Sequence, residues 1–325
     1  MRVRGGPRSV VAVEKGIWMI KDALFREELK NLTSGTVLFD EPTDRYTSIG
    51  VGGKADVIIL PQATEELIRV VSYLQDHQVS FIPVGNWTNL IVKDGGYRGA
   101  IICLKGLHEI SVEDRENDMV SIYAEAGVAL GEIVNLSANE AFGGIEFCAG
   151  IPGSVGGSIR MNAGAYGSEI KDVLEWVSLL ERGGKILKVR RDDLDFAYRN
   201  LNLPEGSVIT GASFLLRRGK REEIRERITE ILGLRKKKHP LGYRSAGSIF
   251  KNPRGIPAGQ LIDEIGLKGA RIGDAKISEK HGNFILNLGH AKASDILALI
   301  DMVKERVLKE KGITLEVEVM IIGDN

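Results

Sequence analysis

The sequence predicts an α+β protein built from several consecutive units. Residues 55–104 alternate buried-strand and helix patterns, whereas the chain after 106 is made of short strands around one helix. A strongly charged helix after 219 then opens a last section that ends in a helix and a strand. Because 325 residues exceed one typical core, we expect separate domains. Their predicted bounds are an N-terminal extension at 1–30, a first unit at 31–105, a second at 106–218 and a third at 219–325.

The first unit is predicted to be a small α/β layer. Strands are expected at 55–61, 79–84 and 100–104, where apolar runs end in polar or glycine-containing loops. Thr64 begins a helix with an acidic first turn, which the helix dipole favours. The loops at such strand ends are where α/β proteins bind ligands. The inward face of the helix is expected to consist of Leu67, Val70, Val71 and Leu74.

The second and third units are predicted from shorter patterns. Ser294 is expected to cap a last helix, which Gly312 ends before an alternating strand at 313–322. The second unit should contain one helix and several strands, at 130–140 and at 121–125, 176–180, 185–189 and 208–216. The charged helix of the third unit lies between 219 and 239, with an apolar stripe of Ile224, Ile228, Ile231 and Leu232.

Composition narrows the class of partner. Lysines plus arginines number 44, and so do aspartates plus glutamates, so no general charge favours nucleic acid or an anionic membrane. Without an apolar run long enough to span a bilayer or a recognisable signal peptide, we expect a cytoplasmic protein that acts on a small molecule, without membrane insertion. Cys103 and Cys148 lie in apolar sequence, which indicates buried reduced thiols. The histidines are scattered, and no metal site is expected.

The stretch 149–167 is the most informative part of the chain, because it places six glycines among small residues with almost no charge. Glycine reaches positive φ cheaply and exposes peptide N–H groups to a ligand. A flexible linker is the alternative, but linkers are rich in Ser, Lys and Glu, whereas this stretch carries Ile151, Val155 and Ile159. We interpret it as a ligand-binding loop.

Two further glycine turns, at 46–53 and 85–89, flank predicted strands of the first unit. A single glycine turn is more often a hairpin than a ligand site. Three such turns in regions that can pack together suit an extended cofactor with a diphosphate. No Gly-x-Gly-x-x-Gly motif leads into a helix, so a Rossmann nucleotide site is excluded.

These turns belong to a series of six motifs in one order. They are Thr-Ser-Ile-Gly-Val-Gly-Gly, Gly-x-x-Thr-Asn-Leu, Ala-Gly-Ile-Pro-Gly-Ser-Val-Gly-Gly with Asn-Ala-Gly-Ala-Tyr-Gly, Phe-x-Tyr-Arg, Ala-Gly-Ser-x-Phe-Lys-Asn-Pro and Leu-Glu-x-Glu-Val. With these motifs the chain resembles the UDP-N-acetylenolpyruvoylglucosamine reductase family from Tyr46 to Gly323.

The resemblance implies an FAD-binding fold of the vanillyl-alcohol-oxidase/PCMH type in two subdomains, followed by a C-terminal α+β domain that closes over a UDP-sugar. It also implies non-covalent FAD, NADPH as co-substrate, and reduction of an enolpyruvyl ether to a lactyl ether in peptidoglycan precursor synthesis. Little separates Arg199 from Ser248, so the chain is similar to the family's shorter class, which lacks a tyrosine-bearing insertion. Two alternatives stay open: another FAD-dependent oxidoreductase of the same cofactor fold, and a non-catalytic binder of flavin or UDP-sugar.

The resemblance also implies three catalytic residues. Hydride from reduced flavin leaves negative charge beside the substrate carboxylate, so electrophiles and a proton donor are needed there. Ser248 matches the proton donor, Arg199 the arginine that grips the carboxylate, and Glu318 a carboxyl group that assists the same intermediate. To donate to an enolate, Glu318 must be protonated, which requires burial to raise its pKa. Without the motifs, Ser248 would be interpreted as a serine of a turn and Arg199 as a surface arginine. Glu318 would be interpreted as part of a polar strand face that it shares with Glu316.

Ligand positions follow from the same motifs. Trp87 stands where the family usually has glycine. If that position needs positive φ, the tryptophan is strained by roughly 1–2 kcal/mol; otherwise its indole packs on the cofactor or the neighbouring domain. FAD is still expected to bind, because the other two turns are complete. The positions implied for substrate are Tyr198, Asn252 and Asn283, and those implied for the cofactor are Gly50, Gly52, Gly53, Gly85, Asn86, Trp87, Thr88, Asn89, Gly150, Ile151, Pro152, Gly153, Ser154, Gly156, Gly157, Asn162 and Gly164.

A basic cluster, 235–238, ends the charged helix. It could neutralise the diphosphate of a UDP-sugar. Cations in the last turn of a helix are, however, favoured by the dipole at about 0.3–1 kcal/mol each. We therefore favour the capping role and expect at most one of the four side chains to contact a ligand.

Overall fold

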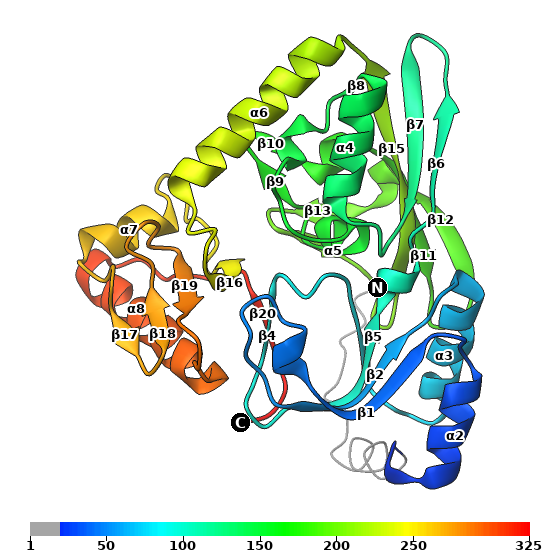
Figure 1. Ribbon diagram of the computed structural model, residues 1–325, viewed down its shortest axis with the longest axis horizontal. Helices are drawn as coiled ribbons and strands as arrows, with labels where there is room; N and C mark the ends of the chain where they lie inside the picture. Colours follow the sequence, from blue (N-terminus) through cyan, green and yellow to red (C-terminus); the bar gives the residue numbers. More distant parts are fainter. Residues whose placement is uncertain (1–19) are drawn as a thin grey trace, which may run out of the picture.

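The computed structural model describes residues 20–325 and arranges them in three units, each with its own sheet (Figure 1). In the first unit the edge strand β1 is antiparallel to β2, and the other strands are parallel. The four strands follow the order β1 (Thr36–Pro42), β2 (Lys54–Leu60), β5 (Tyr97–Cys103) and β3 (Phe81–Val84), and the sheet packs with helices α2 (Ala23–Asn31) and α3 (Thr64–Asp76).

The predicted elements of the first unit are confirmed in kind and position. Helix α3 begins at Thr64, as expected, and its first turn is acidic. Its four predicted inward residues are fully buried and belong to the main hydrophobic cluster. Residues 1–19 of the predicted N-terminal extension lie outside the described residues. Helix α2 and strand β1 were not foreseen, because their sequences carry no clear period.

The second unit is an antiparallel sheet covered by helices α4 (Leu130–Glu140) and α5 (Val155–Arg160). The expected helix at 130–140 and the four expected strands are confirmed. Two short hairpins lie beside the sheet: β9 (Gly164–Ala165) with β10 (Ser168–Glu169), and β13 (Asp195–Ala197) with β14 (Asn200–Asn202). The sheet order is β12 (Ile186–Arg190), β11 (Leu174–Leu180), β15 (Val208–Arg218), β7 (Met119–Glu125) and β6 (Ile110–Asp114), with β8 (Phe142–Gly143) on β15.

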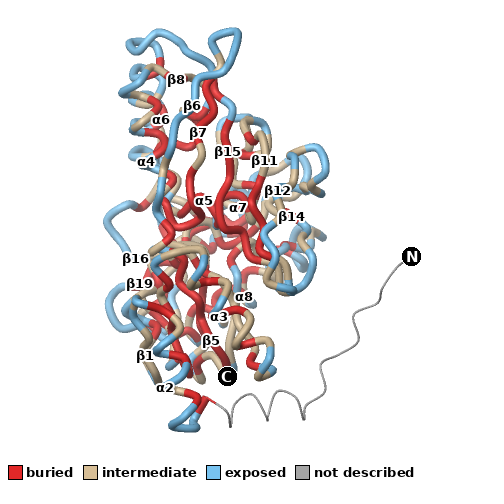
Figure 2. Tube along the Cα trace, turned by 90° about the vertical axis from the view of Figure 1, so that its right-hand side faces the viewer, coloured by how far each residue is buried: buried red, intermediate tan, exposed pale blue. Residues whose placement is uncertain are grey.

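The third unit has a smaller antiparallel sheet, against which the long helix α8 (Ala293–Lys311) packs. Its strand order is β16 (Arg244–Ser248), β19 (Phe284–Asn287), β18 (Ala275–Ile277) and β17 (Arg271–Ile272), and a short helix, α7 (Ala258–Glu264), completes it. As predicted, Gly312 ends α8, in a left-handed conformation with φ +67°. Buried residues follow the sheets and the inner helix faces, whereas the outer loops are exposed (Figure 2).

The third unit is joined to the first by a shared apolar cluster and by backbone pairing. Ile49, Val51 and Ile91 of the first unit are buried in the same cluster as the core of the third. At the end of the chain, β20 (Met320–Ile322) returns to the first unit and pairs in parallel with β4 (Leu90–Val92). The first and third units therefore share one packed apolar core, to which residues of the first glycine turn contribute.

Asp94 adds a capping contact across this junction. Its two carboxylate oxygens accept hydrogen bonds from the N–H groups of Ala293 (2.8 Å) and Ser294 (2.9 Å), at the start of α8. Lys292, not Ser294, is the N-cap residue, so the predicted serine cap is wrong. A carboxylate from a distant segment satisfies the free amides instead.

We expect Asp94→Ala to lower the stability of the fold by about 0.5–2 kcal/mol, the usual cost of a lost helix cap. Burial acts to raise the pKa of Asp94, but the hydrogen bonds from Ser294 and Ala293 outweigh burial and hold the pKa below its ordinary value. The contribution should therefore be complete above the ordinary aspartate pKa and disappear as pH falls through the lowered one. Thermal unfolding at several pH values measures it, with Asp301→Ala on the exposed face of α8 as control. Equal losses in both variants would contradict the capping role.

The charged helix α6 (Arg221–Lys238) packs against α4, β8 and the turn at Glu146–Cys148, all in the second unit. Ile224 and Ile231 of its predicted stripe are buried, but Leu232 is 45% exposed, so its inclusion in the stripe is wrong. The domain bounds stay a prediction. The packing of α6 favours a junction between the second and third units after Lys238 rather than at 218.

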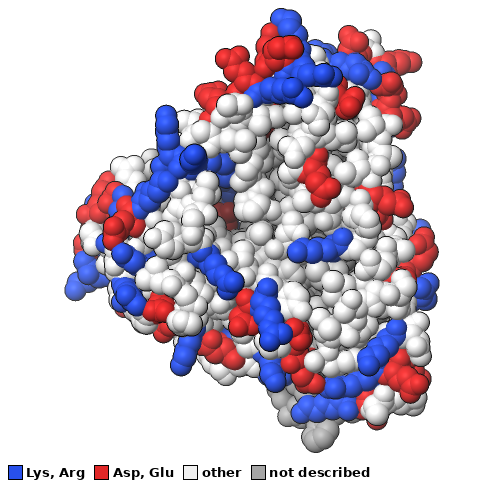
Figure 3. Space-filling model, viewed as in Figure 1, with Lys and Arg blue, Asp and Glu red and all other residues white. Residues whose placement is uncertain are grey.

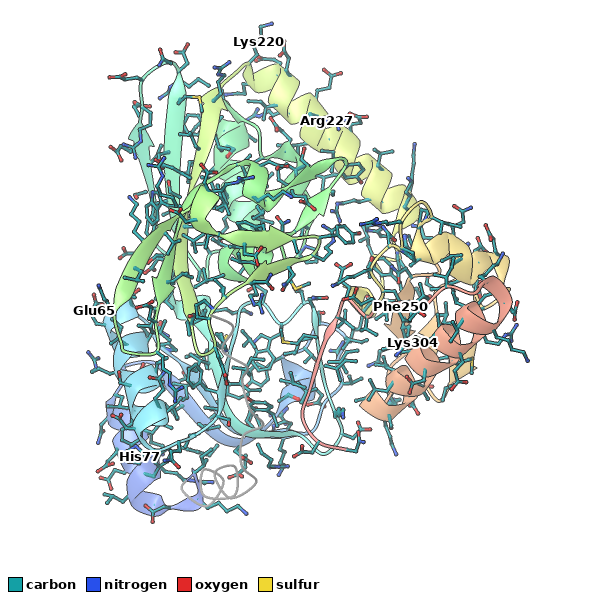
Figure 4. All side chains as sticks on the ribbon, turned by 180° about the vertical axis from the view of Figure 1, so that it is seen from behind. Glu65, His77, Lys220, Arg227, Phe250 and Lys304 are labelled. Atoms are coloured by element: carbon teal, nitrogen blue, oxygen red, sulfur yellow. The ribbon has the colours of Figure 1, made fainter. Side chains whose placement is uncertain are left out.

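The last strand was predicted too long. Residues 313–319 cross from α8 to the first unit without forming a ladder, apart from one bridge between Phe250 and Val317. Figure 4 shows Phe250 beside this crossing segment. The sequence does alternate here, but a strand forms only where a neighbouring strand pairs with it over several residues. At this segment the neighbouring chain pairs at one bridge only.

Candidate active site

The three glycine turns lie in direct contact. Ser48 of the first turn donates its N–H to the carbonyl of Trp87 (3.1 Å) in the second. Thr88 of the second donates its hydroxyl to the carbonyl of Pro152 (3.3 Å) in the third. A Cβ atom added to Gly85 would stand 1.9 Å from Oγ of Ser154. The predicted convergence of the turns is thus a property of the fold, and their close approach requires glycine.

Trp87 adopts the strained conformation that the sequence left open. Its φ is +56°, in the left-handed region that costs a bulky residue about 1–2 kcal/mol. The indole is only 3% exposed and belongs to an apolar cluster of the first unit, with its centroid 5.5 Å from that of Tyr46. Its Nε1 has no hydrogen-bond partner among the described residues. The side chain therefore fills the core beneath its own turn.

Arg199 and Glu318 come from different units and form an ion pair, with 3.4 Å between Nε and Oε1. Arg199 lies in the turn between β13 and β14 at φ +56°, and its guanidinium also donates to the carbonyl of Gly164 (2.8 Å). Strained backbone of this kind clusters at functional sites. The hairpin thus holds the guanidinium at the edge of the second unit.

Backbone hydrogen bonds place Ser248 close to Glu318. It ends β16, and the next residue, Ile249, accepts the N–H of Glu318 (2.8 Å). The side chain of Asn89, in the second glycine turn, donates to the carbonyl of Glu318 (3.3 Å). The structure therefore gathers the three predicted catalytic residues beside the second glycine turn.

Glu318 and Glu316 differ in how far they are covered, although Lys251 is near both. Glu316 is 72% exposed and pairs with Lys251, whereas the side chain of Glu318 is 18% exposed. Burial raises the pKa of Glu318 above its ordinary value and outweighs the opposite effects of Arg199 and Lys251. This is the direction that a hydrogen-bond-donating carboxyl group requires.

Three asparagines of the predicted site direct their side chains into the protein. Asn283 brackets the backbone of Phe250, donating to its carbonyl (2.8 Å) and accepting its N–H (2.9 Å). Asn162 donates to the carbonyl of Ala197, two residues before Arg199 (3.1 Å). Asn252 accepts the first N–H of α7, that of Ala258 (3.0 Å). These contacts favour positioning roles: Asn283 holds the chain that follows Ser248, and Asn162 holds the hairpin of Arg199.

A cavity of about 430 Å³ opens beside Arg199. Tyr198, which the motifs imply for substrate, lines it, and so do Gly164 and Tyr166, a tyrosine outside the expected set. Tyr166 has φ +55° and belongs to the motif Asn-Ala-Gly-Ala-Tyr-Gly of the glycine stretch. Its place in that motif was the sequence signal that could have identified it. Lys171 and Asp172 add charge to the wall.

Three further features bear on the class of site. Cys103 and Cys148 are free and buried, as predicted. Within residues 20–325 no His, Cys, Asp and Glu side chains group in a way that could hold a metal ion. A search of the same residues for a helix both long and apolar enough to cross a bilayer gives no candidate.

Two family models match most of the chain. Residues 55–190 match an FAD binding domain, and residues 239–322 match the C-terminal domain of UDP-N-acetylenolpyruvoylglucosamine reductase. Both the α+β fold class and the cofactor-binding fold expected from the sequence are confirmed.

Relatives with this name are similar over nearly their whole length. The reductase of Syntrophus aciditrophicus is 53% identical, covering 94% of this chain and 98% of the relative. That of Caldanaerobacter subterraneus subsp. tengcongensis is 43% identical, covering 90% and 96%. The crystal structure of the Thermus caldophilus enzyme superposes with a TM-score of 0.74 at 35% identity, covering 88% of this chain and 98% of that one. The chain therefore belongs to the UDP-N-acetylenolpyruvoylglucosamine reductase family, FAD-dependent oxidoreductases of peptidoglycan synthesis.

Proposed function

We propose that Ser248, Arg199 and Glu318 perform the family's reaction at the junction of the three units. That reaction reduces the enolpyruvyl ether of a UDP-sugar to a lactyl ether at the expense of NADPH. The observation that carries the assignment is the contact between Arg199 and Glu318, whose N–H in turn binds the residue after Ser248. Side chains from two units thereby converge beside the glycine turns.

The glycine turns fit FAD. Gly153 has φ +150°, and the space where its Cβ would stand is bordered by the hydroxyls of Ser158 (3.5 Å) and Thr88 (3.7 Å). Peptide groups and hydroxyls in such a concave arrangement suit phosphate oxygens. We propose that residues 50–53, 85–89 and 150–157 hold the cofactor. When bound, FAD supplies the hydride that it has accepted from NADPH.

Arg199 is proposed to bind the substrate carboxylate. Its guanidinium keeps a fixed position through Gly164 and Glu318, and a guanidinium has five N–H donors in a planar fork. Groups left over from these contacts can bind a carboxylate in a bidentate manner and stabilise negative charge that spreads onto it during reduction. The permanent charge makes this role independent of pH in the physiological range.

Ser248 is proposed to donate the proton to the carbon next to the carboxylate. A hydroxyl is a poor acid in water, so it can act only on a strongly basic carbanion in a site from which water is excluded. Ser248 is half-buried at the end of β16, and the bound substrate and cofactor are proposed to complete the exclusion of water. Glu318, in its protonated form, is proposed to donate a hydrogen bond to the same developing charge.

The two half-reactions test the proposal. The purified FAD-containing protein is reduced anaerobically by NADPH and then mixed with the enolpyruvyl UDP-sugar, while flavin absorbance is followed. Reoxidation only upon addition of the sugar supports the reductase. Reoxidation by a carbonyl compound, the oxidised product of an alcohol, instead of by the sugar would favour another oxidoreductase of this fold. Absence of reoxidation by either compound would favour a non-catalytic binder.

Glu318→Gln tests the protonated carboxyl group. In the unchanged enzyme the second half-reaction should slow as pH rises through the raised pKa of Glu318, because the donor form is lost. The glutamine variant keeps a donor at every pH, so this limb of the profile should vanish. Because the raised pKa disfavours the ionised carboxylate in the fold, Glu318 should also cost stability as pH rises through that pKa. Glu316→Gln, at the exposed neighbour, is the matched control, and an unchanged limb in Glu318→Gln would contradict the role.

The partner proposed for the site is a small nucleotide-linked substrate together with NADPH. We further propose that the protein works in the cytoplasm, because the nucleotide substrate and the reduced cofactor that its family's reaction consumes are found there. Fractionation of cells, with activity measured in each fraction, tests the location.

A further inference from the structure

The hairpin that carries Arg199 is poorly stabilised by its own sequence. Its strands, β13 and β14, pair at three positions only, and two residues, Tyr198 and Arg199, connect them. The φ of Arg199 is +56°, a conformation that favours glycine over a residue with a long side chain. A two-stranded hairpin alone is at best marginally stable in water. The position of Arg199 therefore has to be fixed by contacts from outside the hairpin.

Helix α5 supplies such contacts from its C-terminal end. Arg160, the last residue of α5, donates from Nη1 of its guanidinium to Oδ1 of Asn200 (2.8 Å) and to the carbonyl of Leu201. Asn162, two residues further along the chain, donates to the carbonyl of Ala197 (3.1 Å). Arg160 thus holds β14 and Asn162 holds β13, so both strands that flank the strained turn are anchored to the end of the helix.

The hydrogen bonds of Arg160 continue across the hairpin. Asn200 donates to Oδ1 of Asn202 (2.6 Å), which in turn donates to Oδ2 of Asp195 (2.7 Å) on the opposite strand. Among the described residues no carboxylate forms an ion pair with Arg160, and burial lowers the pKa of its guanidinium. A cation that is covered from water and held by neutral oxygens is costly to keep, so these contacts favour a role in fixing the hairpin.

The other end of α5 belongs to the proposed cofactor site. Ser154 caps the helix by accepting the N–H of Gly157 (3.3 Å), so the helix begins within the third glycine turn. Only six residues separate this beginning from the end that holds the hairpin. Figure 3 shows a hollow in the molecular surface between the second and third units, the side toward which the hairpin extends in Figure 1. Arg160 therefore connects the cofactor turn with the guanidinium of Arg199.

We propose that Arg160 is a positioning residue for the reaction, because it fixes the hairpin so that Arg199 keeps a constant place relative to the cofactor turn. The proposal rests on the proposed function, since it takes Arg199 as the group that binds the substrate carboxylate. In this role Arg160 acts only through Arg199. Asn200 directly follows Arg199 in the chain, so a shift of β14 is passed to the guanidinium. A displacement of about 1 Å in a reacting arrangement can cost about 10²-fold in rate.

Arg160→Met is the main test, because methionine keeps part of the apolar stem and removes the hydrogen bonds to β14. In the FAD-containing protein, reoxidation of the reduced flavin by the enolpyruvyl UDP-sugar should reach a lower maximal rate and need more sugar for half of it. The combined loss should be about 10–100-fold. Flavin content and the rate of reduction by NADPH should stay within about twofold. Arg218→Met, which removes the partner of Asp114 on the same sheet, is the matched control and should change neither half-reaction.

A double variant shows whether Arg160 acts through Arg199. Arg199→Met should itself impair the second half-reaction, and the addition of Arg160→Met should then cause no further loss. A further loss as large as that of Arg160→Met alone would show independent action and overturn the proposal. An unimpaired Arg199→Met would overturn the proposed role of Arg199 and this proposal with it. An impaired Arg199→Met beside an unimpaired Arg160→Met would overturn the positioning role alone.

The pH profile and a conservative variant separate positioning from general support of the fold. Burial raises the pKa of Glu318, and the charges of Arg199 and Lys251 act against it. If the guanidinium of Arg199 moves away, that pKa should rise further, so the second half-reaction of Arg160→Met should slow only at higher pH. Arg160→Lys should recover part of the rate, because an ammonium group can still donate to one of the two oxygens. A lowered Tm with equal losses in both half-reactions, an unshifted profile and no recovery by lysine would show a merely structural role and overturn the proposal.

Discussion

Ser248→Ala is expected to slow reoxidation of the reduced flavin by the enolpyruvyl UDP-sugar by about 10²–10⁴-fold, the usual contribution of a positioned proton donor. The hydroxyl is proposed to deliver the proton after hydride transfer, so its loss leaves the developing carbanion without an acid. Reduction of the flavin by NADPH should proceed at the unchanged rate, because that step needs no proton from Ser248. Stopped-flow absorbance measures the two steps separately.

Ser245→Ala is the matched control for this variant. Ser245 lies three residues earlier on β16 and contacts the first glycine turn through its carbonyl, which accepts the hydroxyl of Ser48 (2.7 Å). Loss of its own hydroxyl should leave both half-reactions within about twofold of the original rates, as for a surface change away from the chemistry. If Ser248→Ala slowed both half-reactions equally, the residue would be supporting the site rather than donating a proton.

Trp87→Ala is expected to destabilise the first unit by about 3–5 kcal/mol, the range for truncation of a buried aromatic side chain. The indole is buried in an apolar cluster and packs near Tyr46, so its removal leaves a large cavity. Trp87→Gly should be more stable than Trp87→Ala by about 1 kcal/mol, because φ is +56° and only glycine adopts that conformation without strain. This reverses the usual order of alanine and glycine, and the midpoint of urea unfolding measures it.

Trp87→Phe isolates the unpaired indole N–H. Because Nε1 has no partner among residues 20–325, its loss breaks no hydrogen bond there. The smaller ring still leaves part of the indole volume empty, so the variant should lose stability, but less than the about 3–5 kcal/mol expected of the alanine variant. Flavin content after purification should be retained in the phenylalanine variant. An alanine variant more stable than the glycine one would contradict the strain at this position.

Much of the fold could be predicted because it is written in local patterns. Helix α4 was predicted residue for residue, since its apolar period is clear. The first-unit strands were found for the same reason, as runs of apolar residues between turns. Helix α2 was missed, because its short and largely exposed sequence owes its place to Phe25 and Leu29, which pack on the core of another segment.

The candidate site could be predicted only as a set of positions. The motifs named Arg199, Ser248 and Glu318, but no local pattern says that a glutamate at the end of the chain meets an arginine over a hundred residues earlier. The strand pattern placed Glu316 and Glu318 on one face, but only the packing of the units decided that Glu318 is the covered one, at 18% exposure against 72% for Glu316.

By itself, the sequence determined the cofactor class, the family and the three glycine turns, because glycine spacing and motif order are local and survive without coordinates. Only the tertiary structure decided that Trp87 faces inward, that Asn162 and Asn283 hold backbone, and that the Nε of Arg235 is buried without a hydrogen-bond partner among residues 20–325. These are properties of what surrounds a side chain. They depend on which distant segments exclude water from it, and no window of sequence contains that information.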